Sequence, residues 1–104
     1  MKEISVSELK QWQDEGKEFQ LIDVREPFEY EMSNLGGENI PLANVLLEKD
    51  KISKDIPVVM QCRSGARSAA ALNQLEQNGY TNVYNLTGGI LAWAAEIDPE
   101  LSVY

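Results

Sequence analysis

The pattern of apolar and polar positions along this chain predicts short strands separated by helices. Three runs have the closely spaced apolar residues of strands that are covered on both faces of a parallel sheet. They are FQLIDV at residues 19–24, IPVVMQC at 56–62 and NVYNL at 82–86. Helical patterns occupy four further segments, at residues 5–16, 26–32, 66–80 and 88–97.

The helical segments carry start and stop signals. Ser5 and Glu8 have the spacing of a capping box, and Ser7 offers a simple N-cap as an alternative. Pro27 stands where the first turn of a helix tolerates proline. Gly79 ends the alanine-rich third helix, as glycine commonly does after a helical C-terminus. The signals therefore agree with the apolar pattern.

Strands that alternate with helices at this length predict an α/β fold with a small, mostly parallel sheet and helices on both faces. We expect residues 1–104 to form a single domain, because a chain of 104 residues has room for one core. Ligands of such folds bind beyond the carboxyl ends of the strands. Cys62 closes one predicted strand, and Asp23 and Arg25 close another. We therefore expect a functional site at this edge of the sheet.

The composition narrows the possible functions. A formal net charge of −8 and a pI near 4.4 argue against nucleic-acid binding. No apolar run approaches the roughly 20 residues that span a bilayer, and the start, MKEISVSELK, lacks the apolar segment of a signal peptide. We therefore expect a cytoplasmic protein without a membrane partner. The chain has one cysteine and no histidine, which excludes Cys-His catalytic pairs and the usual zinc sites. We expect neither a metal nor a cofactor.

The only cysteine, Cys62, lies in the segment QCRSGARS at residues 61–68. A lone cysteine at a strand end is more often a small buried hydrophobic residue than a nucleophile. Here small residues after Cys62 let backbone N–H groups turn toward the sulfur, the next helix adds its positive end, and Arg63 and Arg67 add full charges. We therefore expect the pKa of Cys62 to lie below the free value of about 8.5. The residues expected to bind substrate beside Cys62 are Arg63, Ser64, Gly65, Ala66, Arg67 and Ser68.

Three motifs, in this order, resemble the rhodanese-homology family of thiosulfate sulfurtransferase-like proteins. They are LIDVREPFEYEM at 21–32, CRSGARSA at 62–69 and LTGGILAWAAEI at 86–97. The resemblance covers essentially the whole chain and implies a five-stranded parallel sheet flanked by helices. It also implies that Cys62 accepts sulfane sulfur as a persulfide held by loop amides. The terminal segment IDPELSVY is similar to the ending of rhodanese domains that are fused to enzymes activating sulfur-carrier proteins.

Other positions have two interpretations. The resemblance implies that Asp23 and Arg25 brace the cysteine loop, whereas a helix N-cap and a surface charge are the alternative. Arg25 and Glu29 have the spacing of a modest surface ion pair. Asn34 stands where the family has a histidine, so we expect altered local packing there. Gly88 and Gly89 suit a tight turn where backbones pass closely. We expect three aromatic residues in the core, namely Trp12, Tyr84 and Trp93.

The length of the cysteine loop favours sulfur over phosphate chemistry. Cysteine phosphatases and arsenate reductases have one residue more between cysteine and arginine than the four between Cys62 and Arg67. We therefore predict a sulfurtransferase that takes sulfur from a thiosulfate-like anion, whose charge Arg63 and Arg67 help to hold. The Cys62 persulfide then passes the sulfur to an external thiol acceptor. A persulfide-delivery module for a sulfur-carrier activating enzyme is the second interpretation, and a phosphatase or arsenate reductase is the third.

Overall fold

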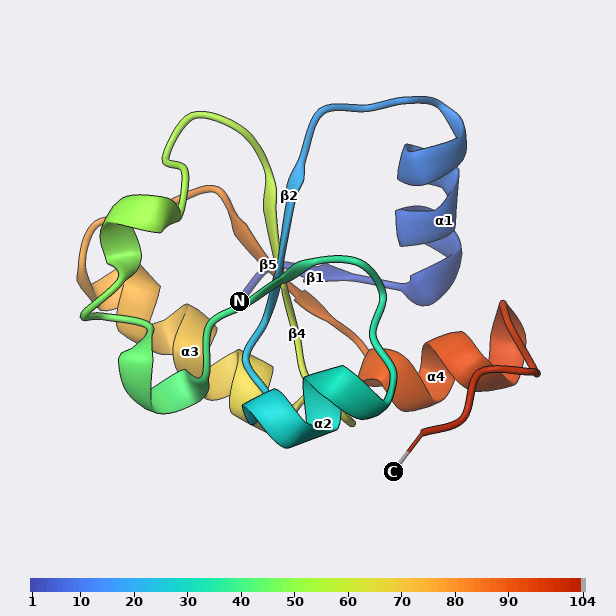
Figure 1. The fold of residues 1–104 in the computed structure, drawn as a ribbon. Helices are drawn as coiled ribbons and strands as arrows, with labels where there is room; N and C mark the ends of the chain where they lie inside the picture. The colour runs from blue at the N-terminus through green and yellow to red at the C-terminus, as the bar shows by residue number, and fades with distance from the viewer. Residues whose placement is uncertain (104) are drawn as a thin grey trace.

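Five parallel strands form the centre of the fold in the computed structural model, which describes residues 1–103 (Figure 1). Tyr104, the last residue of the IDPELSVY segment, lies outside the described residues. The sheet order is β1-β5-β4-β2-β3, and every pairing is parallel. The bounds are β1 Glu3–Ile4, β2 Gln20–Asp23, β3 Glu38–Asn39, β4 Val58–Gln61 and β5 Val83–Leu86. This confirms the predicted α/β class.

The helices begin and end close to their sequence signals. They are α1 Val6–Asp14, α2 Pro27–Met32, α3 Ala66–Gln77 and α4 Gly89–Glu96, with two 3₁₀ turns at Leu42–Asn44 and Lys49–Lys51. Ser5, rather than Ser7, is the N-cap of α1. Its hydroxyl accepts a hydrogen bond from the Glu8 amide at 3.1 Å, and the Glu8 carboxylate accepts one from the Ser5 amide at 3.1 Å. Pro27 is the first residue of α2, as predicted.

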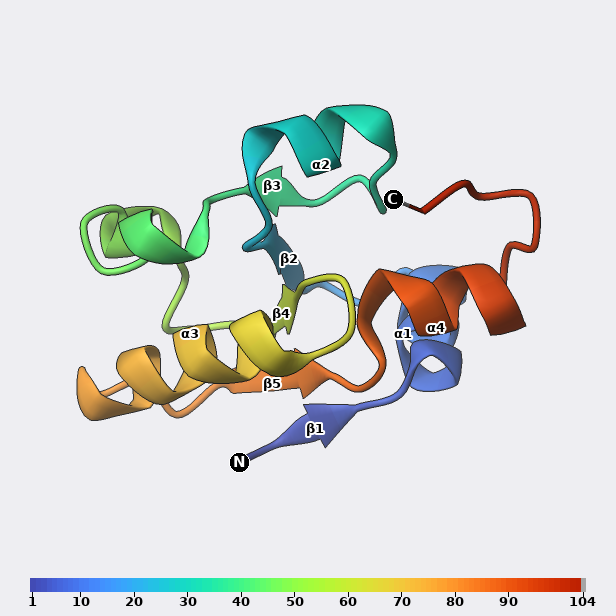
Figure 2. The same ribbon diagram turned by 90° about the horizontal axis from the view of Figure 1, so that it is seen from below.

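The sheet separates two apolar layers (Figures 1 and 2). Helix α3 covers one face, and α1 and α4 cover the other. Because successive strand residues point to opposite faces, Val58 and Met60 pack in the α3 layer while Val59 packs in the layer of α1 and α4. Cys62 follows Met60 by two residues and also lies on the α3 side.

The aromatic residues expected in the core differ in burial. Trp93 is buried in the layer of α1 and α4. Trp12 and Tyr84 are only partly buried, and their rings meet edge to face with centroids 5.6 Å apart. The amine of Lys17 lies 4.1 Å from the centre of the Trp12 ring, in a cation–π contact. Trp93 therefore lies in the core as expected, and Trp12 and Tyr84 pack against the core at its margin.

The carboxyl ends of β2 and β4 lie together at one edge of the sheet. Asp23 ends β2 opposite Gln61, which ends β4, and the Val24 amide donates to the Gln61 carbonyl oxygen at 2.9 Å. Helix α2 follows β2 at this edge, and the cysteine loop follows β4 (Figure 1). Within residues 1–103, no helix combines the length and apolar character needed to cross a bilayer.

Candidate active site

The loop after β4 curls back on the sulfur of Cys62. Gly65 has φ +117°, in the left-handed region that glycine tolerates, and it precedes the first residue of α3. This turn aims the Gly65 amide at the sulfur, to which it donates a hydrogen bond at 3.1 Å. The hydroxyl of Ser68, one turn into α3, lies 3.3 Å from the same sulfur. The sulfur therefore faces hydrogen-bond donors at the start of a helix.

Two opposing influences set the pKa of Cys62. Burial raises the pKa of the thiol, whereas hydrogen bonds from the Ser68 hydroxyl and from the amides of Ser68, Gly65 and Ser64 lower it. The lowering influences prevail, so the pKa lies below that of an ordinary cysteine. Hydrogen bonds at the loop, rather than arginine charges, are the leading cause of this lowering. This corrects the emphasis that the sequence places on Arg63 and Arg67.

Cys62 is both a buried residue of the apolar core and a hydrogen-bonded sulfur, the two environments that its sequence position allowed. Its side chain is only 1% exposed and belongs to the apolar layer beneath α3. The sulfur nevertheless receives polar contacts from Gly65 and Ser68. This low exposure of Cys62 predicts that loop motion helps to admit a substrate atom to the sulfur.

Helix α4 holds the cysteine loop from behind. The Ile90 amide donates to the Cys62 carbonyl oxygen at 3.0 Å, and the Leu91 amide donates to the Arg63 carbonyl oxygen at 3.1 Å. These bonds satisfy donors at the N-terminus of α4. In a planar trans peptide the N–H points opposite to the C=O, so the amides of Arg63 and Ser64 point away from α4. The loop is thus fixed with these amides turned from the helix.

Gly89 allows this close approach. A Cβ atom at Gly89 would lie 2.5 Å from the carbonyl oxygens of Cys62 and Arg63. The φ of Gly89 is also positive, at +58°. The predicted tight turn with closely passing backbones at Gly88-Gly89 is therefore confirmed.

Arg67 is paired with Glu29 of α2. Its Nη1 and Nη2 atoms donate to the two carboxylate oxygens at 2.7 and 2.9 Å. The hydrogen bond from Arg67 lowers the pKa of Glu29 to about 2, against the opposing effect of burial. The predicted Arg25–Glu29 surface pair was therefore wrong, because Glu29 bonds Arg67 across 38 residues of sequence instead. The negative charge of Cys62 adds a smaller contribution to the raised pKa of Arg67.

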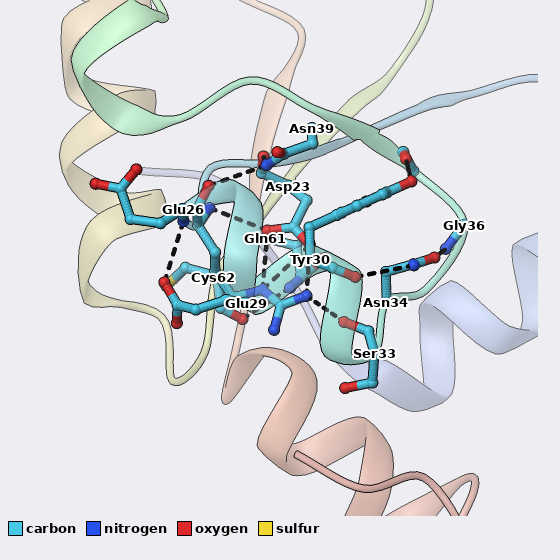
Figure 3. A network of polar contacts seen from close by, with 12 residues as sticks. Asp23, Glu26, Glu29, Tyr30, Ser33, Asn34, Gly36, Asn39, Gln61 and Cys62 are labelled. Atoms are coloured by element: carbon cyan, nitrogen blue, oxygen red, sulfur yellow. Dashed lines mark hydrogen bonds and ion pairs between the residues drawn. The ribbon is translucent and has the colours of Figure 1, made fainter. Parts of the chain in front are cut away.

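Asp23, labelled in Figure 3, forms a buried ion pair with Arg25. Both side chains are 1% exposed, and the Arg25 Nη2 atom lies 2.7 Å from the Asp23 carboxylate. Asp23 also accepts from the Arg25 backbone amide at 3.0 Å. The Arg25 Nη2 atom also donates a hydrogen bond to the Ser33 carbonyl oxygen at 2.8 Å. This bond connects the end of β2 to the end of α2. The interpretation of Arg25 as a surface charge was wrong.

The Asp23–Arg25 pair is connected to α3 through α2. Arg25 donates to the Ser33 carbonyl oxygen at the end of α2, and α2 carries the Glu29 that bonds Arg67 of α3. The pair therefore steadies the helix that holds Arg67. Its role as a brace of the cysteine loop remains a prediction.

Asn34, at the position of the family histidine, closes the turn after α2 (Figure 3). Its Nδ2 atom donates to the Tyr30 carbonyl oxygen at 3.1 Å, and its Oδ1 atom accepts from the Gly36 amide at 2.9 Å. The Tyr30 hydroxyl donates to the Gly37 carbonyl oxygen in the same turn at 2.5 Å. Asn34 therefore supplies its own local hydrogen bonds.

The remaining predicted loop residues differ in placement. Ser68 is buried beside the sulfur, whereas Arg63 and Ser64 of the loop and Ala66, the first residue of α3, are exposed. The structure also adds Asn85 of β5, which sequence analysis missed. Its Oδ1 atom lies 2.5 Å from the Ser68 hydroxyl, and its Nδ2 atom donates to the Gly65 carbonyl oxygen at 3.2 Å. A polar residue at an inward position of an apolar strand was the available signal.

The described residues contain no group of three or more histidine, cysteine, aspartate or glutamate side chains that could hold a metal ion. The hydrogen-bond donors around the buried sulfur of Cys62 stabilise a negative charge on it.

Comparison with known proteins places this geometry in a family. The Rhodanese-like domain family matches residues 5–96. The chain belongs to the rhodanese-like family. A Sulfurtransferase of Allochromatium vinosum is 39% identical over 93 residues, which cover 88% of this rhodanese-like chain and 87% of that protein.

Larger relatives contain the same rhodanese-like region. The Probable adenylyltransferase/sulfurtransferase MoeZ of Mycobacterium tuberculosis is 33% identical over 104 residues, which cover 97% of this chain. The match spans only 26% of that protein's length. Among solved structures, the Rhodanese-like Domain Protein from Staphylococcus aureus superimposes with a TM-score of 0.85 at 31% identity. That match covers 100% of this chain and 99% of the other.

Proposed function

We propose that this rhodanese-like chain is a sulfurtransferase in which Cys62 carries the transferred sulfur as a persulfide. The observation that carries the proposal is the environment of the sulfur, which receives the Gly65 amide at 3.1 Å and lies 3.3 Å from the Ser68 hydroxyl. The same donors that lower the pKa of Cys62 suit a terminal persulfide anion. Similarity to the Sulfurtransferase of Allochromatium vinosum supports the proposal.

In the first step the Cys62 thiolate attacks the outer sulfur of a thiosulfate-like donor. A new S–S bond forms at Cys62 while the donor's own S–S bond breaks, and sulfite leaves with the electron pair of that bond. The hydrogen bonds that lower the pKa of Cys62 favour the thiolate, which is the attacking form, so this step assigns no general base. The amides of the loop, Arg63 to Ser68, hold the outer sulfur. Arg63 supplies positive charge toward the donor, and Arg67 does so to the extent that Glu29 leaves it available.

In the second step an external acceptor takes the outer sulfur. An acceptor thiolate attacks that sulfur, the Cys62 S–S bond breaks, and the thiolate of Cys62 is regenerated. Cyanide reacts in the same way and yields thiocyanate. The acceptor must come from outside because the chain has no second cysteine.

A turnover assay tests this function. With thiosulfate and cyanide, the native protein is expected to produce thiocyanate, and Cys62→Ser is expected to produce none above the buffer rate. Asn73→Leu, on the exposed face of α3, serves as a control for handling and purity. Equal thiocyanate production by the native protein and Cys62→Ser would overturn the proposal.

A delivery role in sulfur-carrier activation is the second candidate, and the similarity to MoeZ favours it. In this role the outer sulfur of the Cys62 persulfide attacks the adenylated C-terminus of a carrier protein, and AMP leaves. An external thiol then cleaves the resulting acyl disulfide at the Cys62 sulfur and releases the carrier thiocarboxylate. A second external thiol reduces the mixed disulfide left on Cys62, since the chain has one cysteine. Persulfide-loaded protein mixed with such a carrier distinguishes the two roles. Faster transfer to the carrier than to small thiols supports delivery, and the reverse order supports the free-standing enzyme.

A phosphatase or arsenate reductase fits the site less well. The loop has four residues between Cys62 and Arg67, and both terminal nitrogens of Arg67 are engaged by Glu29. A phosphate or arsenate held by Arg67 would have to compete with that carboxylate, whereas in the proposed sulfur transfer the loop amides hold the outer sulfur. We therefore expect no turnover of p-nitrophenyl phosphate.

A further inference from the structure

Asn85 and Cys62 lie close together on the face of the sheet that α3 covers. Asn85 of β5 is paired in register with Met60 of β4, and Cys62 follows Met60 by two residues. Since side chains alternate along a strand, all three point toward α3. Asn85 is only 7% exposed. A buried amide therefore lies beneath the N-terminus of α3, beside the reactive sulfur.

The Ser68 hydroxyl is shared among three neighbours. Its oxygen lies 2.5 Å from Asn85 Oδ1, 3.1 Å from the Gly65 carbonyl oxygen and 3.3 Å from the Cys62 sulfur. A serine hydroxyl has a single hydrogen to donate. The Nδ2 atom of Asn85 donates to the Gly65 carbonyl oxygen at 3.2 Å, which leaves Oδ1 as the atom that faces Ser68. The shortest contact of Ser68 is thus with an acceptor other than the sulfur.

The two ionisation states of Cys62 use these hydrogens differently. In the thiol state the S–H donates to Ser68, and Ser68 donates to Asn85, so each hydrogen has an acceptor. In the thiolate state the sulfur has no hydrogen and can only accept. If Ser68 then turns its hydrogen to the sulfur, two oxygens 2.5 Å apart are left with no hydrogen between them. That arrangement is repulsive and opposes donation to the thiolate.

We propose that Asn85 is a positioning residue that competes with Cys62 for the hydroxyl hydrogen of Ser68 and so limits how much of the sulfur is ionised at neutral pH. Its relevance to sulfur transfer rests on the proposed function, whereas its effect on ionisation does not. Asn85 acts through Ser68 and touches no substrate. Removing its acceptor frees the hydrogen for the sulfur.

Substitution of Asn85 leaves the charged groups around Cys62 in place. They are Arg63 in the loop, Arg67 on α3, Glu29 on α2, and Asp23 and Arg25 at the end of β2. The first turn of α4, which bonds the loop carbonyls, carries no charged side chain. A change of pKa on substitution of Asn85 is therefore assignable to the hydrogen-bond network.

Ultraviolet titration of the thiolate tests the proposal, because the chain has one cysteine. The variants are Asn85→Leu, Ser68→Ala and their combination, with Asn73→Leu on the exposed face of α3 as the control. We expect Asn85→Leu to lower the pKa of Cys62 by about half a unit to one unit, and Ser68→Ala to raise it by a similar amount. In the Ser68→Ala background, Asn85→Leu should have no further effect.

Two results would overturn the proposal. One is an unchanged or raised pKa in Asn85→Leu with native circular dichroism. The other is a shift of equal size with and without Ser68, which would mean that Asn85 acts through its bond to the Gly65 carbonyl oxygen. Asn85→Ala, which also lacks an acceptor, replaces the leucine variant if that protein does not fold. Sulfur loading of native Cys62, measured separately, decides the proposed function whichever way the titration falls.

Discussion

Ile90 donates its amide hydrogen to the carbonyl oxygen of Cys62 at 3.0 Å, so α4 holds the residue that we propose as the sulfur carrier. This contact is possible because Gly89 has no side chain where the two backbones meet. The cysteine loop is thus held by backbone from behind and by hydrogen-bond donors in front. The positions of these supports lead to the following predictions.

Gly89→Ala should destabilise the protein strongly. The new Cβ would lie 2.5 Å from two carbonyl oxygens, at a φ of +58°. Strain and overpacking together predict a loss of about 3 kcal/mol in the free energy of unfolding, measured with urea. Gly16→Ala is the matched control, because Gly16 has φ +69° but no atom within 4 Å of the new Cβ. It should lose about 1 kcal/mol. Equal losses in both variants would contradict the close approach at Gly89.

Glu29 should make stability depend on pH in the acidic range. Its pKa is lowered from 4.5 to about 2, chiefly by the bond from Arg67, so its contribution is complete above pH 4.5 and disappears as the pH falls toward 2. Since Arg67 is partly exposed, we expect this contribution to be on the order of 2 kcal/mol.

The test compares urea unfolding of the native protein, Glu29→Gln and Glu31→Gln at neutral pH and at pH 3. Glu31 is exposed on the same helix. Glu29→Gln should lose stability at neutral pH and show a smaller acid-induced change, whereas Glu31→Gln should follow the native protein. Identical pH dependence in all three proteins would rule out the proposed role of the Glu29–Arg67 pair.

Asp23→Asn should be severely destabilising, because it leaves the Arg25 guanidinium buried beside a neutral partner. Breaking one side of a buried pair costs roughly 3–5 kcal/mol. Asp14→Asn breaks the exposed Lys10–Asp14 pair and should cost less than about 1 kcal/mol. Thermal or urea unfolding measures both. A loss below 1 kcal/mol in Asp23→Asn would mean that Arg25 finds other acceptors.

Cys62 should react faster with small reagents than with bulky ones. The residue is 1% exposed, so we expect loop opening to limit the approach of large reagents. Relative to free cysteine, we expect a bulky maleimide to be disfavoured against methyl methanethiosulfonate by on the order of tenfold. Measuring both rates at one pH removes the influence of the pKa. A rate ratio equal to that of free cysteine would show that the sulfur is openly accessible.

The inner part of the fold is readable in the sequence because it rests on local signals. The three inner strands follow from apolar runs, and α1 begins at the Ser5 capping box as the residue spacing predicts. Strands β1 and β3 could not be found in this way. Each has only two residues, so neither makes a recognisable pattern, and each exists because a neighbouring strand end offers a partner.

The site was harder to predict than the fold because its contacts join distant segments. Local spacing places Cys62 and the loop residues correctly at a strand end. Local spacing predicts an ion pair between Arg25 and Glu29, however. In the structure Glu29 pairs with Arg67, and Arg25 pairs with Asp23. Asn85 was missed because its partners lie 17 and 20 residues away. Only the sheet register shows which polar residues share the sulfur's face.

Mass spectrometry of the intact protein after incubation with thiosulfate tests the central claim most directly. The account predicts that the native protein gains the mass of one sulfur atom, that a thiol reductant removes it, and that Cys62→Ala gains nothing. A native protein that stays unmodified, or a Cys62→Ala protein that gains the same mass, would contradict the assignment of Cys62 as the sulfur carrier.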